Sequence, residues 1–106
     1  MDPGWANFQP VTEGQALAVD QGHMEAAETH LTDALASFES LGDHWRAADA
    51  KLNLGTMKLG VGELDEATRW YRAAMDDYSE LGERGGVAIC LTNIADVLYL
   101  RGELEQ

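Results

Sequence analysis

The chain superimposes on itself when it is shifted by 40 residues, and this internal repeat constrains its fold more than any other feature. Under the shift Gly22, Gly62 and Gly102 fall on one another, and the segment 62–66 meets the segment 102–106. Further pairs match in order: Ala27 with Ala67, Leu31 with Tyr71, Ala34 with Ala74, Phe38 with Tyr78, Ala48 with Ala88, Asn53 with Asn93, and Leu54 with Ile94. A chain with such a repeat is expected to stack copies of one small unit.

Each unit is expected to contain two helices, because its apolar residues recur at intervals of three and four. One stripe is Met24, Ala27, Leu31, Ala34, Leu35, Phe38 and Leu41, and 64–81 repeats it position for position. The other helix type carries Trp45, Ala48, Leu52, Gly55 and Leu59. Gly42 and Gly82 follow the first stripes, where glycine favours a left-handed cap, and Asp43 stands where it could cap the next helix.

The fold class predicted is therefore all-α, with five helices and a short C-terminal stub. We expect the helices over 11–21, 23–41, 44–60, 63–81 and 84–101, with the stub starting at Glu103. An irregular segment, 1–10, precedes a repeat domain over 11–106. That domain divides into a first repeat over 11–41, a second over 44–81 and a partial third over 84–106.

The pattern resembles the tetratricopeptide repeat family. The positions of the central unit that carry the resemblance are Leu54, Gly55, Gly62, Ala67, Tyr71 and Ala74. The resemblance implies a right-handed α-solenoid of antiparallel helix pairs with a concave groove. Lys51 and Lys58 depart from it, because the family usually has large apolar residues there. The period is also longer than the 34 residues typical of the family, and is similar to that of kinesin light chain repeats and arrays in bacterial regulatory proteins.

In that family the groove is lined by one face of the first helix of each unit. The corresponding residues are Asp49, Leu52, Asn53, Thr56, Ile89, Thr92, Asn93 and Asp96. Asn53 and Asn93 recur at one helical position, and an amide that both donates and accepts suits the backbone of a bound peptide. Alternatively, the two side chains bond inside their own helix pairs. Asp49 and Asp96 make the groove acidic, so a neutral or basic protein or peptide is the expected partner and a clamp for a carboxylate is not.

Charge excludes other partners. The chain has 19 acidic and 7 basic residues, a formal net charge of -12, so it should repel nucleic-acid phosphate and anionic lipid. It has no apolar run of bilayer length and no signal peptide, and its single cysteine fits a reducing compartment, so a cytoplasmic location is expected. The acidity has two interpretations, adaptation to high salt or an ordinary acidic bacterial domain.

Nothing in the sequence predicts an enzyme, a cofactor or a metal site. His23 and His30 are seven residues apart, two helical turns, and His44 lies elsewhere. Cys90 stands among apolar residues and is expected to be a small core residue rather than a reactive thiol. The chain also lacks a recognisable nucleophile motif and a phosphate-binding loop.

The last predicted helix is apolar on nearly every side, which is typical of a helix buried on more than one face. Its residues Val97, Leu98, Tyr99 and Leu100 are candidates for self-association into a homo-oligomer. Alternatively, the chain is a fragment of a longer array. We therefore expect a scaffold that binds proteins or peptides through its groove. The second hypothesis is an architectural segment of a larger signalling or transcription-regulatory protein, which assembles through the last helix.

Overall fold

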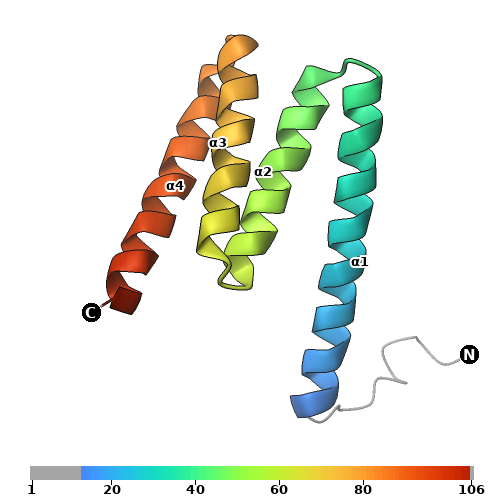
Figure 1. Cartoon of the computed structure of the whole chain (residues 1–106), viewed down its shortest axis with the longest axis vertical. Helices are drawn as coiled ribbons and strands as arrows, with labels where there is room; N and C mark the ends of the chain where they lie inside the picture. The colour runs from blue at the N-terminus through green and yellow to red at the C-terminus, as the bar shows by residue number, and fades with distance from the viewer. Residues whose placement is uncertain (1–12, 106) are drawn as a thin grey trace, which may run out of the picture.

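The computed structural model describes the backbone of residues 13–105 and the side chains of residues 22–102. Four helices follow one another: α1 (Glu13–Ser40), α2 (His44–Gly60), α3 (Leu64–Glu80) and α4 (Arg84–Glu105), as Figure 1 shows. The described residues contain no strand, so the predicted all-α class is confirmed for them. The predicted irregular segment 1–10 lies outside the described residues.

Consecutive helices pack side by side and run antiparallel (Figure 1). The ion pairs between α2 and α3 define their direction. Lys51, in the middle of α2, meets Asp77 near the end of α3 at 2.6 Å, whereas Lys58 near the end of α2 meets Glu66 near the start of α3 at 3.3 Å. The segments before and after Gly62 are therefore an antiparallel pair, as the repeat predicts.

The turns between helices share one geometry. Gly42, Gly62 and Gly82 have φ values of 69°, 81° and 70°, a left-handed conformation that costs glycine little. At the first turn the amide of Gly42 donates to the carbonyl of Glu39, and the amide of Asp43 donates to that of Phe38. This is the Schellman pattern, and the other two turns repeat it. The Asp43 carboxylate also caps α2 by accepting from the amide of Arg46 at 3.1 Å, as predicted.

The prediction of five helices was wrong for the described residues. The predicted helices 11–21 and 23–41 are one helix, α1, which passes through Gly22. The predicted break at Gly102 is also absent, because α4 continues to Glu105. Glycine permits a left-handed turn but does not impose one. Gly62 turns the chain where α2 and α3 pack on each other, while Gly22 and Gly102 continue their helices.

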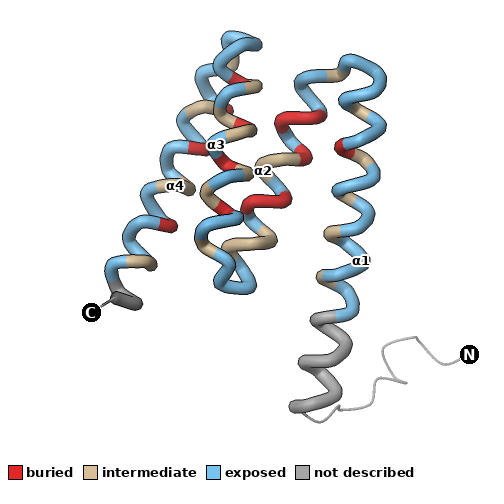
Figure 2. The backbone as a smooth tube through the Cα atoms, in the orientation of Figure 1, coloured by how far each residue is buried: buried red, intermediate tan, exposed pale blue. Residues whose placement is uncertain are grey.

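Buried positions lie where neighbouring helices face one another, as Figure 2 shows, and most of the residues there are small or aromatic. Tyr71 and Tyr78 on α3 are 0% and 3% exposed, because their rings lie between α2 and α4. Tyr71 packs directly on Gly55 of α2, and Tyr78 packs on Gly86 of α4. The remaining buried residues are Leu35, Ala47, Ala48, Ala50, Leu54, Ala67, Ala74, Cys90 and Val97. Gly55 therefore lets the ring of Tyr71 lie directly against the backbone of α2.

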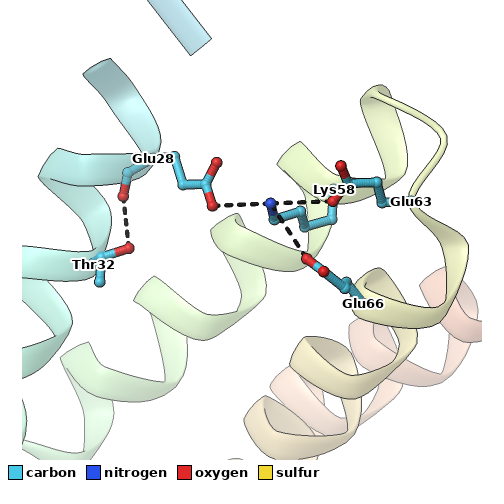
Figure 3. A network of polar contacts seen from close by, with 5 residues as sticks. All are labelled: Glu28, Thr32, Lys58, Glu63 and Glu66. Atoms are coloured by element: carbon cyan, nitrogen blue, oxygen red, sulfur yellow. Dashed lines mark hydrogen bonds and ion pairs between the residues drawn. The ribbon is translucent and has the colours of Figure 1, made fainter. Parts of the chain in front are cut away.

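Lys58 explains one departure from the family pattern. Its ammonium lies 2.9 Å from Glu28 on α1, 3.2 Å from Glu63 and 3.3 Å from Glu66 on α3 (Figure 3). Hydrogen bonds from Lys58 to Glu28 and then to Glu63 raise the pKa of the lysine above its ordinary value. The ammonium of Lys58 therefore connects three consecutive helices through ion pairs. A large apolar side chain at this position could contact only apolar neighbours.

Candidate functional site

The predicted groove residues of α2 form a strip along one side of that helix. Asp49, Asn53 and Thr56 are exposed, and their spacing of four and three residues puts them on one face. Leu52 is half-buried and packs against the clusters around Tyr71 and Tyr78. Leu52 therefore packs beneath the strip, and the three polar residues form the exposed surface of the strip.

Two tyrosine hydroxyls from α3 reach this strip. The hydroxyl of Tyr71 donates to Oγ1 of Thr56 at 3.1 Å, and the hydroxyl of Tyr78 donates to Oδ1 of Asp49. Asp49 and Thr56 are seven residues apart on α2, as Tyr71 and Tyr78 are on α3, so the two bonds lie about two helical turns apart. They hold α2 against α3 in a single register and orient Thr56 and Asp49 in the strip.

Burial and the bond to Asp49 also set the ionisation of Tyr78. Burial first, and the hydrogen bond to the carboxylate second, raise the pKa of Tyr78 above its ordinary value. The hydroxyl therefore stays protonated as a donor at neutral pH. The Asp49 carboxylate accepts this hydrogen bond at the edge of the strip and gives the strip an acidic residue there.

Sequence analysis missed Trp45 as a member of this surface. Its ring is 48% exposed and stands edge-on to the ring of Tyr78, with centroids 6.5 Å apart and planes at 84°. Trp45 precedes Asp49 by four residues, one helical turn, and so extends the strip with an aromatic side chain. The four-residue spacing from Asp49 could have indicated that Trp45 belongs to the strip. Trp45 also fits the apolar stripe of its helix, and that stripe explained its presence without the strip.

The predicted groove residues of α4 form the second strip. Ile89, Thr92 and Asp96 are exposed, and Asn93 is half-buried. The hydroxyl of Thr92 donates to the carbonyl of Ala88 at 3.0 Å, which satisfies it within its own helix. Because Tyr71 and Tyr78 contact both α2 and α4, α3 sets the spacing of the two strips.

The recurring asparagines remain available for other partners within the described structure. Among the side-chain hydrogen bonds between described residues, none involves Asn53 or Asn93. The strips therefore combine exposed polar residues with the half-buried Asn93.

Other predicted residues have structural places. Cys90 is fully buried and burial raises the pKa of its thiol, which fits the expected core role. His23, His30 and His44 are exposed, and no group of metal-ligating side chains occurs in the described part of the chain. The described residues also include no helix long and apolar enough to cross a bilayer.

Val97 requires a correction. It was predicted to be a self-association residue, but it is 0% exposed and packs with Ala67 and Tyr71. A helix that is apolar on all sides does not reveal which side its neighbour covers, and here α3 covers the side of Val97. Leu98, Tyr99 and Leu100 are 59%, 69% and 41% exposed.

Comparison with known families matches residues 46–106 to the tetratricopeptide repeat, a span that includes α3, α4 and nearly all of α2. Neither curated proteins nor solved structures yield a match. The matched span contains the Gly62 turn, the Tyr71–Gly55 contact and both polar strips. The chain therefore belongs to the tetratricopeptide repeat family.

Proposed function

We propose that the chain is a scaffold that binds a protein or peptide segment along the strips of α2 and α4. Tetratricopeptide repeats generally mediate protein–protein interaction, and the family is a non-enzymatic scaffold. The ligand is a neutral or basic extended segment, because Asp49 and Asp96 give both strips negative charge. We also propose that the groove residues named above form the binding surface and that the chain is located in the cytoplasm.

One observation carries the proposal. Asn53 and Asn93 occupy one position in successive repeats, on helices whose separation is set by the buried tyrosines of α3. An amide can donate to one backbone carbonyl and accept from one backbone amide, so two such residues at a fixed spacing can hold an extended segment. Because the helices are already packed, binding requires little ordering of the scaffold.

The test uses a displayed library of random peptides, selected on the immobilised 106-residue chain. Selected peptides should be neutral or basic, and replacing both asparagines, Asn53→Ala with Asn93→Ala, should weaken their binding by about tenfold or more. Titration of labelled chain with one selected peptide, followed by NMR, should shift the side-chain amide signals of both asparagines. Binding can be measured by fluorescence anisotropy.

The matched control is the pair Arg72→Ala and Asp76→Ala, on the exposed face of α3, which leaves the net charge unchanged. It should leave peptide affinity unchanged. Selection of acidic peptides, or equal affinity in the asparagine variant and the parent chain, would remove the groove from consideration.

A second function is favoured by a separate observation. Leu91, Leu98 and Tyr99 on α4 are each more than half exposed, at 54%, 59% and 69%. Exposed apolar side chains that gather on one helix are typical of an interface. The second proposal is therefore an architectural role, in which the chain assembles through this face of α4.

A further inference from the structure

The uncovered side of α4 is equivalent to a side of α2 that is buried within the chain. The 40-residue shift places α4 on α2 and α3 on α1. On α2, the side that carries Ala48 and Gly55 is buried against α3. The equivalent residues of α4, Ala88 and Ala95, are exposed. Within the described residues the junction of α2 with α3 is thus complete, and α4 carries an uncovered copy of the α2 side of that junction.

The α3 side of this junction also has an uncovered equivalent, which lies on α1. Ala67 of α3 is 0% exposed in the α2–α3 junction, whereas its equivalent on α1, Ala27, is exposed. Tyr71 and Tyr78 are almost fully buried because they lie between two helices, whereas their equivalents Leu31 and Phe38 are half-buried in a cluster with residues of α2. Among the described residues, α1 therefore lacks the neighbour that α3 has in α2.

We propose that α4 of one copy of the chain docks on α1 of a second copy, in the antiparallel register of α2 with α3. This inference deepens the architectural role proposed above and is independent of peptide binding by the strips. Residues at equivalent positions change together on both sides of the junction.

The ion pairs between α2 and α3 have no equivalents between copies, because both partners of each pair are replaced. Lys51 bonds to Asp77 at 2.6 Å within the chain, and the equivalent pair between copies is Leu91 with Ser37. Lys58 contacts Glu66 at 3.3 Å, and the equivalent pair is Leu98 with Ala26.

The third ion pair, Lys58 with Glu63 at 3.2 Å, becomes Leu98 with His23. Each lysine that would be unpaired is replaced by leucine, and each carboxylate that would be unpaired is replaced by serine, alanine or histidine. The junction between copies therefore buries neither an unpaired lysine nor an unpaired carboxylate at these positions, which favours a stable apolar contact.

The size and polarity of the side chains also change together on the two sides of the junction. A Cβ at Gly55 would lie 2.7 Å from the ring of Tyr71, and the equivalent pair is Ala95 with Leu31, in which a methyl group is added and the ring is removed. The hydrogen bond from Tyr78 to Asp49 becomes Phe38 with Ile89, an apolar pair.

The other tyrosine bond, to Thr56, has no counterpart, because Leu31 and Asp96 stand at its positions. Asp96 belongs to the polar strip and can keep its carboxylate in water. Two copies joined in this way again expose one α4 and one α1, so the contact is head-to-tail and continues beyond a dimer.

The test measures the mass of the 106-residue chain by sedimentation velocity over a range of concentrations. The mass should rise from the 11.6 kDa of one chain through dimer to higher species. Leu91→Lys with Leu98→Lys restores the lysines of α2 on α4, and Ala26→Glu with Ser37→Asp restores the acids of α3 on α1. Each variant alone should need roughly a hundredfold higher concentration to associate, because it buries unpaired charge.

Mixing the two variants in equal amounts should restore association. One junction then pairs the new lysines with the new carboxylates, and the other is the unaltered contact. Circular dichroism checks that each variant keeps its helices. The proposal is overturned if the parent chain stays at the mass of one chain at about millimolar concentration, if either variant associates like the parent, or if the mixture does not associate. The polar strips are unaltered in both variants, so peptide binding should persist whichever result is found.

Discussion

The contact of Tyr71 with Gly55 shows how single residues set the distance between helices. The ring occupies the space where any larger residue would place its Cβ, so α2 and α3 approach at the ring and are held there by the hydroxyl bond to Thr56. A large side chain opposite a residue with none is a complementary pair, and changing either member alone leaves a clash or a cavity.

Substitution of this glycine tests the contact. Gly55→Ala should destabilise the fold by about 1–3 kcal/mol, because overpacking outweighs the roughly 1 kcal/mol of helix propensity that alanine adds. In a Tyr71→Leu background the same substitution should stabilise, since the ring is gone and the added methyl group has room. Urea unfolding followed by circular dichroism measures both. If Gly55→Ala destabilises equally in the two backgrounds, the ring does not define the contact.

At the scale of helices and turns, equal residues have unequal roles. Gly22 and Gly62 occupy the same repeat position, yet only Gly62 is in a left-handed turn. The adjacent helices α2 and α3 pack on each other along their length, and this packing stabilises the reversal at Gly62. At Gly22 the helix continues instead. Local sequence allows both outcomes, and the packing of the flanking segments selects one.

The two glycines should respond oppositely to alanine. Gly22→Ala should stabilise the chain by about 0.5–1 kcal/mol, because among the described residues nothing lies within 4 Å of the added Cβ and alanine favours helix. Gly62→Ala should destabilise by about 1–2 kcal/mol, because φ is 81° there. Thermal unfolding of the two variants and the parent compares them. Loss of stability on Gly22→Ala would show a turn at that glycine in place of the continuous α1.

Charge acts at the scale of the whole molecule. With a net charge of -12, the folded chain repels itself, and Lys51 and Lys58 place their few positive charges between helices where carboxylates gather. Salt screens long-range repulsion strongly, while short, partly buried ion pairs are screened less. Added salt should therefore stabilise the fold.

Melting in potassium chloride tests this balance. The melting temperature should rise by about several degrees between low and molar salt, because screening lowers the repulsion among the carboxylates. Scanning calorimetry at one protein concentration measures it, and repeating the scan with Leu91→Lys and Leu98→Lys separates screening from association. A flat melting temperature would exclude adaptation to high salt as the reason for the acidity.

The sequence by itself determined the helical class, the repeat, the positions of α2 and α3 and the glycine turns between the helices. These follow from spacing and local backbone preference, which act over a few residues. Tertiary structure alone decided that Gly22 continues a helix, that Val97 is covered by α3, and that Trp45 and two tyrosine hydroxyls belong to the strip of α2. Those outcomes depend on which face meets a neighbour, and a periodic pattern that is apolar on several faces does not specify the neighbour.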